Sequence, residues 1–484
     1  MDEISLRQSN RIPSTSKPAR FIRRGVMPLR LTRSFCWGIW TGLSLLLVSA
    51  MPAAAQPVLP PPGFAPGEVD ESTFAPSSDR YTGSGSDSQI FDSTSSQGYP
   101  RRNRILSGDG RIAAERGTRV LIEDDEPPLP RVWFRPEALI WWSQSSPLPV
   151  PLVTNGSPDD AIPGGLGQPG TSVLIGDQDI SLPVRGGGRF TLGFSFDAEQ
   201  TWGIEGTYFS LANSRLSQGV FSNGGTGSPW LAVPYYNPLT PGEDATPIAL
   251  PGEFAGQAVV SLRNFLQGTE INVLHNVLNS TGVRLDLLGG FRYVNLQENL
   301  LFATESPNVY PNPPAFFDTF DQFNASNNFY GGQFGLRASY DWARFFMNAS
   351  GKLALGSTFE TVNVNGGTFT NVGGYASAPG AYLTQPTNIG SWTSSQFAVV
   401  PELDLKIGVR LAPWASFTVG YSFLYLSSVA RPGEQIDRVI NPSQSSAIST
   451  NFPASLVGPS RPAMVIHHTD FWAQGLNFAL EFRF

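Results

Sequence analysis

Apolar and polar residues alternate with a period of two along ten segments of this chain, and this pattern constrains the fold more than any other feature. In ASFTVGYSFLYL, Phe417 and Val419 fall on one face while Ser416 and Thr418 fall on the other. A period of two is that of a β-strand with one apolar and one polar face. The ten segments run near 132–143, 188–198, 201–212, 268–279, 282–296, 328–341, 343–361, 395–411, 414–428 and 472–484.

The connections between these segments alternate between very short and long. The short ones are 197–200, 279–282, 341–342 and 411–414, and the long ones are roughly 144–187, 213–267, 304–327, 362–394 and 429–471. Short turns on one rim and long loops on the other are typical of outer-membrane barrels. A soluble sandwich of two sheets does not require its short and long connections to alternate in this way. The chain is therefore predicted to be all-β: a transmembrane antiparallel up-and-down β-barrel of ten strands, with long outer loops and short periplasmic turns.

One long connection leaves the strand count open. Within 144–187, the stretch TSVLIGDQDISLPV has the composition of an additional hairpin. If that hairpin reached the membrane, the count would become twelve, which is also an even number.

The N-terminal region has the composition of a targeting segment. Basic residues precede the short apolar run 35–50, and Ala53, Ala54 and Ala55 supply the small residues of a cleavage site. We expect a cleaved signal peptide over 1–55, with cleavage near Ala55, and the true start is either Met1 or Met27.

The rest of the chain divides into two parts. Residues 56–130 are rich in Pro, Ser and Gly, which predicts a disordered periplasmic linker, and 131–484 form the predicted barrel. The single cysteine, Cys36, lies within the predicted signal peptide, so the mature chain cannot rely on disulfides. The formal net charge of −7 argues against nucleic-acid binding, which needs basic patches.

Five stretches of the sequence together resemble the putative beta-barrel porin family of planctomycete bacteria. They are RPEALIWWSQSSPLPVPLVTNGSP (135–158), GGLGQPGTSVLIG (164–176), GGGRFTLGFSFDAEQTWGIEGTYF (186–209), LLGGFRYVNLQENL (287–300) and FTVGYSFLYLSSVARPGEQIDRVINPSQ (417–444). The resemblance covers about residues 131–484. It implies an outer-membrane barrel and supplies no catalytic residues to carry over.

Charged residues occupy the polar face of the predicted strands, which should line the lumen. By alternation these residues are Arg135, Glu137, Arg189, Glu205, Glu270, Arg284, Asp286, Arg292, Arg337, Lys352, Glu402, Asp404, Lys406, Arg410, Glu481 and Arg483. They either line a pore for small hydrophilic solutes or form a salt-bridge lattice, because ten strands enclose only slightly more space than the eight that side chains can fill. The near balance of signs argues against strong ion selectivity.

Two histidines at the outer rim raise the possibility of a surface enzyme. His467 and His468, followed by Asp470, enter the last strand from the outer loop, as in an enzyme of omptin or lipase type. A polar rim pair is the favoured interpretation, so no enzyme activity is expected. Adjacent histidines need a further ligand to hold a metal, so neither a metal nor a cofactor is expected. His275 falls on the apolar face of its strand and is expected at an interface.

Two further features concern the loops. The glycine-rich GLGQPG and GGGRF lack the Lys-Ser/Thr ending and the following helix of a phosphate loop, so glycine here marks tight turns and strand curvature. The loop 430–444 is predicted to fold over or into the barrel mouth, with Arg431, Glu434, Asp437 and Arg438 able to form ion pairs.

The expected function is passive passage of small hydrophilic solutes or a structural role in the bacterial outer membrane. The alternatives are the surface enzyme and a protein that adheres or binds through its long loops. The expected partners are outer-membrane lipid, the barrel-assembly machinery and small hydrophilic solutes, with no nucleic acid.

The chain ends on LNFALEFRF, an alternating strand whose terminal residues resemble the signal read by the outer-membrane assembly machinery. Phe482 and Phe484 are the predicted assembly signal. Deleting Phe484 or replacing it with a charged residue should impair assembly far more than a similar change within 56–130, as measured by the yield of folded barrel in the outer membrane. Equal effects at both places would contradict the assignment.

Overall fold

A computed structural model describes residues 130–308, 315–372, 376–449 and 455–484. The predicted signal peptide and nearly all of the predicted linker therefore lie outside the described residues. Within the described ranges the regular secondary structure is almost entirely β, and the strands form two sheets. No helix in these ranges has the length and apolarity needed to cross a membrane.

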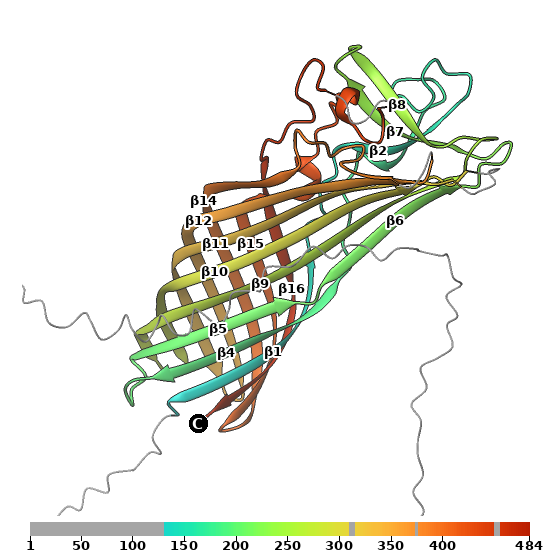
Figure 1. Cartoon of the computed structure of the whole chain (residues 1–484). Helices are drawn as coiled ribbons and strands as arrows, with labels where there is room; N and C mark the ends of the chain where they lie inside the picture. The colour runs from blue at the N-terminus through green and yellow to red at the C-terminus, as the bar shows by residue number, and fades with distance from the viewer. Residues whose placement is uncertain (1–129, 309–314, 373–375, 450–454) are drawn as a thin grey trace, which may run out of the picture. The chain divides into compact units, whose positions relative to one another are not determined.

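Ten antiparallel strands close into a ring, as the sequence predicts (Figure 1). They are β1 (Val132–Ser143), β4 (Arg185–Ser195), β5 (Trp202–Leu211), β9 (Gly256–Ser280), β10 (Val283–Glu305), β11 (Phe317–Trp342), β12 (Phe345–Thr370), β14 (Gly390–Ala412), β15 (Ala415–Ala430) and β16 (His468–Arg483). The ring closes because β1 pairs with both β4 and β16, while β9 pairs with both β5 and β10. Each strand thus satisfies its backbone groups on two sides, which a lipid environment requires.

The first and last strands meet at the short-turn rim. The backbone N–H of Phe484 donates to the carbonyl of Val132 at 2.9 Å, and the Phe484 carbonyl accepts from the N–H of Arg131 at 2.9 Å. The Arg131 carbonyl in turn accepts from the N–H of Ser195 on the neighbouring strand at 2.7 Å. The terminal residue therefore takes part in closing the ring.

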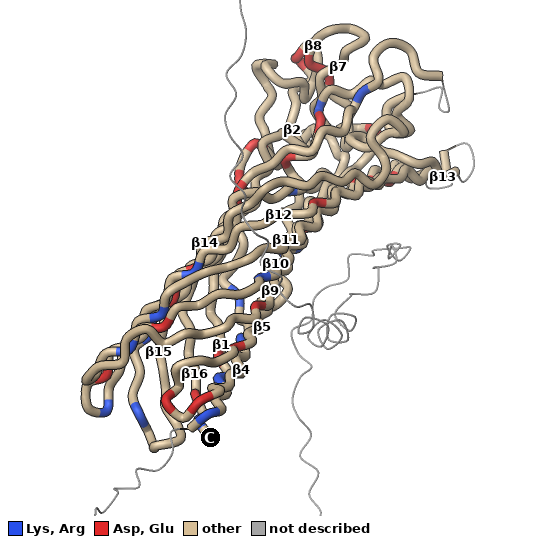
Figure 2. The backbone as a smooth tube through the Cα atoms, turned by 90° about the vertical axis from the view of Figure 1, so that its left-hand side faces the viewer, with Lys and Arg blue, Asp and Glu red and all other residues tan. Residues whose placement is uncertain are grey.

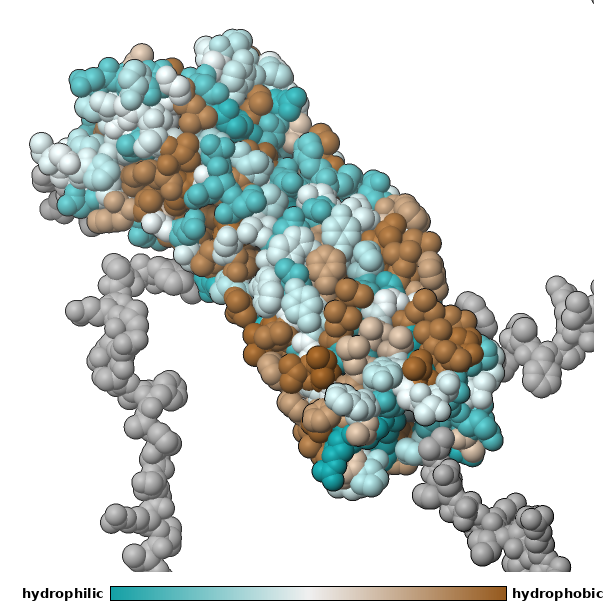
Figure 3. All heavy atoms as spheres, turned by 180° about the vertical axis from the view of Figure 1, so that it is seen from behind, coloured by the Kyte–Doolittle hydropathy of each residue, from teal (hydrophilic) through white to brown (hydrophobic). Residues whose placement is uncertain are grey.

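Apolar side chains cover the outside of the barrel wall toward the short-turn rim. Phe190, Leu405 and Ile407 are exposed, as are many other outward-facing apolar residues of the ring. Figure 3 shows how such residues gather over the part of the barrel that lies toward this rim. An apolar surface of this extent matches the lipid-facing band of a membrane barrel.

Several strands extend well beyond the length that a membrane requires. A transmembrane strand needs about 9 to 11 residues, whereas β9 to β12 have 23 to 26. The short strands β6 (Ser214–Ser222) and β13 (Ala376–Pro379) pair with the upper parts of β9 and β12 and enlarge the sheet to twelve strands. The prediction that 304–327 and 362–394 are long loops is therefore only partly correct. In part of this region, outward-facing positions such as Asn324, Ser326 and Asn363 are polar, so the alternation with apolar residues is lost there although the strand continues.

A second, four-stranded sheet lies beside the outer end of the barrel (Figure 1). It consists of β2 (Pro151–Gly156), β3 (Val173–Gly176), β7 (Trp230–Asn237) and β8 (Gly242–Ala249). The stretch 171–184 does not form the suspected hairpin: its one strand, β3, pairs with β2, and Ile180 forms an isolated bridge with Ser146. Both β2 and β3 belong to the second sheet, so the ring keeps ten strands. Leu152, Ile175 and Ile248 pack here against Phe302 and Phe323 of the ring, in one buried apolar cluster.

Two glycines of β12 offer a test of how tightly the ring is packed. A Cβ on Gly356 would lie 2.0 Å from the Tyr330 carbonyl oxygen of β11, whereas a Cβ on Gly351 meets no atom within 4 Å. Gly356→Ala should lower the free energy of unfolding by about 1–3 kcal/mol because the neighbouring strand must shift. Gly351→Ala is the matched control and should leave the free energy of unfolding nearly unchanged. A urea titration of each refolded barrel measures this free energy. Equal stability of the two variants would contradict this packing.

Candidate functional site

The barrel interior holds a connected network of charged side chains. Arg189 of β4 lies at its centre, with Nη2 2.6 Å from Oε2 of Glu137 on β1 and Nη1 3.1 Å from Oδ1 of Asp404 on β14. Lys406 Nζ lies 2.7 Å from Oε1 of the same Glu137. Because the polar face of each strand points inward, charges far apart in the sequence meet across the ring, and Figure 2 shows both signs distributed along the barrel wall.

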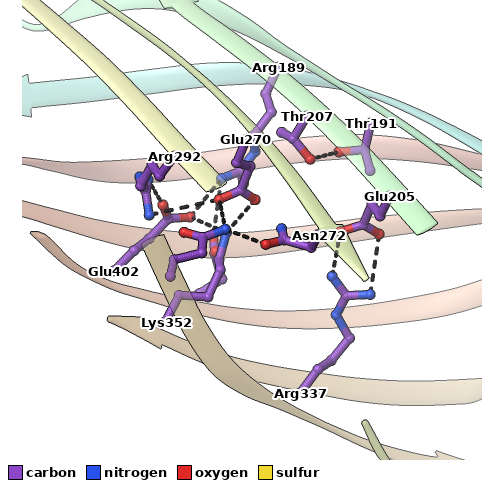
Figure 4. Close-up of polar contacts among 12 residues, drawn as sticks. Arg189, Thr191, Glu205, Thr207, Glu270, Asn272, Arg292, Arg337, Lys352 and Glu402 are labelled. Carbon is purple, nitrogen blue, oxygen red and sulfur yellow. Dashed lines mark hydrogen bonds and ion pairs between the residues drawn. The ribbon is translucent and has the colours of Figure 1, made fainter. Parts of the chain in front are cut away.

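The network continues on the opposite wall of the barrel (Figure 4). Lys352 Nζ lies 2.7 Å from Oε1 of Glu270 and 3.0 Å from Oε1 of Glu402. Arg292 pairs with Glu402 and, at 3.8 Å, with Glu270. Arg189 also approaches Glu402 at 3.8 Å, so the two walls are joined. We call the set Arg135, Glu137, Arg189, Glu270, Arg292, Lys352, Glu402, Asp404, Lys406 and Glu481 the charge lattice.

The remaining predicted lumen residues lie toward the short-turn rim. Glu205 pairs with Arg337 at 2.6 Å, and Arg284 pairs with its neighbour Asp286 at 3.0 Å. Two predicted residues do not lie within the interior. Arg410 pairs with Asp341 and Arg483 with Glu481, and the side chains of Arg410 and Arg483 are 43% and 51% exposed at the rim.

Little space remains within the charge lattice. A cavity of about 40 Å³ lies here and is lined by Arg189, Lys352 and Asp404 among others. A buried water needs roughly 10–15 Å³ by the same measure, so this cavity holds a few waters at most. Asn272 Nδ2, Arg292 Nη1 and Gln333 Oε1 are buried in this part of the barrel without a hydrogen-bond partner in the described ranges.

An apolar layer closes the barrel on the outer side of the charge lattice. Inward-facing Trp141, Phe329 and Phe471 are fully buried, together with Leu139, Phe209, Val294, Val400 and Leu424. We call these residues the apolar layer. The sequence analysis missed it because inward positions were expected to be polar throughout. The signal was present in LIWW (139–142) and FLYL (423–426), where both faces of the strand are apolar.

The loop after β15 folds into the barrel mouth, as the sequence predicts. We call residues 431–445 the outer plug; it contains the 3-10 turns η2 (Pro432–Gln435) and η3 (Pro442–Gln444). Arg431 is fully buried, and its Nε and Nη2 each lie 2.8 Å from a carboxylate oxygen of Glu298 on β10. Its Nη1 donates to the Ser145 carbonyl at 2.8 Å, and its guanidinium lies 5.4 Å from the Phe471 ring centroid.

Two other charges of the outer plug pair with neighbouring segments. Arg438 pairs with Glu243 of β8, and Asp437 pairs with Arg461 at 2.8 Å. Burial raises the pKa of the Glu434 carboxyl above its usual range, although the nearby Arg431 lowers it. The plug is thereby tied to the barrel, to the second sheet and to the loop before β16.

The rim histidines do not form a compact site with Asp470. His468 Nδ1 lies 2.8 Å from Oε2 of Glu360, whereas Asp470 accepts from the Tyr425 hydroxyl at 3.1 Å. His467 is held through its backbone, whose N–H donates to the Gln435 side chain at 2.9 Å. Among the described residues, no group of three His, Cys, Asp or Glu side chains is placed to hold a metal ion.

His275 stacks on Trp202, with 4.1 Å between ring centroids, close to the short-turn rim. Gly167 of GLGQPG, and Gly164 directly before this stretch, have positive φ angles of 83° and 86° and lie in tight turns. Glycine adopts this left-handed conformation without steric cost.

The buried pair Arg431 and Glu298 is predicted to anchor the outer plug. Arg431→Met leaves a buried carboxylate without its partner, so it should cost about 3–5 kcal/mol of stability. The double variant Arg431→Met with Glu298→Met removes both charges and should recover much of this loss. Denaturant unfolding and hydrogen exchange of the outer plug measure both effects. A double variant as unstable as the sum of the singles would contradict the pairing.

Comparisons with known proteins place this architecture in a family. The model of the family described as Putative beta barrel porin-7 (BBP7) matches residues 133–484. No curated protein matches the chain.

Solved outer-membrane barrels resemble the chain distantly. The outer membrane protease OmpT from Escherichia coli is 11% identical, with a TM-score of 0.35, over 73% of this chain and 97% of that chain. A Pseudomonas aeruginosa FadL homologue is 8% identical, with a TM-score of 0.19, over 72% and 89%. The toluene transporter TodX of P. putida is 8% identical, with a TM-score of 0.17, over 73% and 90%. TM-scores this low carry no argument about activity or substrate. The family match over the ring of ten strands shows that this chain belongs to the Putative beta barrel porin-7 family and is an outer-membrane β-barrel.

Proposed function

We propose that this barrel has a structural role in the outer membrane and does not pass solutes in the conformation described above. The observation that carries the proposal is the succession of three closures along its axis, formed by the charge lattice, the apolar layer and the outer plug. A solute that enters from the short-turn side would have to cross all three.

Each closure resists opening for a different physical reason. Separating the charges of the lattice would leave buried ions without partners, which costs several kcal/mol for each ion. The apolar layer excludes ions because a narrow apolar constriction does not hold water. The outer plug is fixed by Arg431 and Glu298, both of which are completely buried.

Passive passage of small hydrophilic solutes remains the second candidate function. The cavity of about 40 Å³ within the charge lattice and the unpartnered Asn272 Nδ2 beside it favour a wet interior on the short-turn side. Passage would also require the outer plug to leave and the apolar layer to part.

The proposal includes no enzymatic role, since His468 is engaged with Glu360 and lies apart from the contacts of Asp470. We further propose that outer-membrane lipid contacts the exposed apolar side chains of the ring. Export through a cleaved signal over 1–55 and recognition of Phe482 and Phe484 by the barrel-assembly machinery complete the proposed localisation.

Conductance across a planar bilayer tests the proposal. The refolded chain should give no discrete conductance steps, because the three closures leave no continuous water path. Membrane insertion must be verified independently, by protease protection of the barrel in vesicles made of the same lipids as the planar bilayer.

A variant that combines Trp141→Ala, Phe329→Ala and Phe471→Ala thins the apolar layer and should still conduct little, because the charge lattice and the outer plug remain. Regular conductance steps from the unaltered, inserted chain would overturn the structural proposal and establish the pore.

A further inference from the structure

The outside of the barrel wall changes character beyond the membrane on one side of the ring. Every outward-facing residue of β10 within 295–299, of β11 within 322–328 and of β12 within 361–365 is Asn, Gln, Ser or Thr. We call this surface the amide face. It is continuous because the three strands are adjacent and antiparallel.

Strand register arranges the amide face in rows. Asn299 of β10 is opposite Asn324 of β11, which is opposite Asn363 of β12. The next row toward the membrane holds Gln297 and Ser326. From residue 328 to residue 322 the face extends on the order of 20 Å along the strand. Arg263 of β9 lies beside Asn299, and Arg215 of β6 lies opposite Arg263, so two arginines continue this row beyond β10.

The side-chain amides of this face form some hydrogen bonds with one another and leave other donors and acceptors without a protein partner in the part of the chain that the structure describes. Asn295 Nδ2 donates to Asn328 Oδ1 at 2.9 Å, and Gln297 Nε2 donates to Asn295 Oδ1 at 3.0 Å. Asn299 Nδ2 donates to Asn324 Oδ1. Among the described residues, neither the Gln297 carboxamide oxygen nor the Asn324 amide nitrogen has a further protein partner. Both donors and acceptors are therefore presented, in an order fixed by the ladder.

The amide face begins directly above a row of tyrosines. Tyr208, Tyr293 and Tyr330 lie in one row by register, and the rings of Tyr293 and Tyr330 are 5.0 Å apart. Tyr293 also donates its hydroxyl to Asn328 Oδ1 at 2.9 Å. Tyrosines of membrane barrels mark the level of the lipid headgroups. The amide face therefore starts where the acyl chains end, on the side of the long loops.

We propose that the amide face binds the sugar headgroups of glycolipid in the outer leaflet. Sugar hydroxyls both donate and accept hydrogen bonds, and so do the carboxamides of Gln297, Asn299 and Asn324. The three strands of the face carry no outward charge in these rows, and cations that could attract a phosphate lie only at its β9 edge, where Arg263 is opposite Arg215 of β6. A glycolipid whose acyl chains lie against the exposed apolar residues of these strands places its sugars on the amide face, so the two contacts are continuous.

The inward side of the same strand segments explains why these strands are ordered outside the membrane. Leu300, Phe323 and Val362 face inward there and are buried in the apolar cluster with the second sheet. This packing stabilises the tall wall without help from the outward side chains. The outward positions are consequently free to serve binding.

Binding of purified lipopolysaccharide tests the proposal. The full chain in detergent is titrated with lipopolysaccharide that carries its complete core oligosaccharide, with lipid A that lacks the core, and with phosphatidylglycerol. The complete form should bind tightest. Combining Asn299→Ala, Asn324→Ala and Asn363→Ala should weaken its binding about tenfold, by loss of several hydrogen bonds, and leave lipid A binding unchanged.

The matched control is Asn279→Ala with Ser280→Ala, at the opposite rim, which should bind both lipids like the unaltered chain. Far-UV circular dichroism verifies that each variant is folded. If the triple variant does not fold, the single variant Asn363→Ala, at an exposed position, replaces it. This variant should lower the affinity for complete lipopolysaccharide by less than tenfold and leave lipid A binding unchanged.

Three results would overturn the proposal. The first is equal binding of complete lipopolysaccharide by the triple variant and the unaltered chain. The second is equal affinity of the unaltered chain for complete lipopolysaccharide and lipid A, which would leave recognition to phosphate and acyl chains. The third is dimerisation of the unaltered chain that the triple variant loses, which would assign the amide face to a second copy. The proposal depends on placement in the outer membrane and is independent of whether the barrel conducts.

Discussion

Backbone hydrogen bonding within the membrane is the constraint on which the rest of this structure depends. Lipid offers no partner to an unpaired N–H or C=O, so a sheet that crosses it must close on itself. In this chain the closure joins the residues that begin and end the ring, Val132 and Phe484. Once the ring is closed, alternation forces every second side chain outward into lipid and the others into a narrow interior. The apolar surface and the charge lattice are two results of the same geometry.

A narrow interior must be filled, and this protein fills it with charges and apolar groups at different levels. The charges of the lattice are tolerated because they lie against opposite charges, as Arg189 does with Glu137 and Asp404. The apolar layer beyond them needs no such pairing and excludes water. The outer plug then covers the mouth and is held by the buried ion pair of Arg431 and Glu298. Removing one charge of this pair should lower the stability more than replacing both charges with apolar residues. Together, the three levels occupy the interior of the ring at successive heights from the short-turn side to the mouth.

The wall of the barrel is unequal in height, and this asymmetry gives the protein two different outer surfaces. On one side, β9 to β12 continue far past the membrane, supported from within by the apolar cluster shared with the second sheet. On the other side, β1, β15 and β16 end sooner, near aromatic residues such as Trp142 and Tyr421, whose rings lie 6.2 Å apart. The taller side carries the amide face. A surface of this kind has no role in closing the barrel, so its composition is open to selection for binding.

The sequence by itself determined the ring. In stretches such as LNFALEFRF each outward position must be apolar to face lipid, and this requirement can be read residue by residue without knowing the strand's neighbours. It also determined that residues such as Arg189 and Glu402 face inward, since parity alone decides the face. It did not determine that Arg189 meets Asp404, or that Arg431 meets Glu298, because those partners are set by the register of strands that are distant in sequence. It also missed the tall wall, where Asn299, Asn324 and Asn363 stand outside the membrane and the apolar signal of a strand is lost. Only the tertiary structure decided these features, because hydrogen-bonded neighbours and not local composition hold that part of the chain extended.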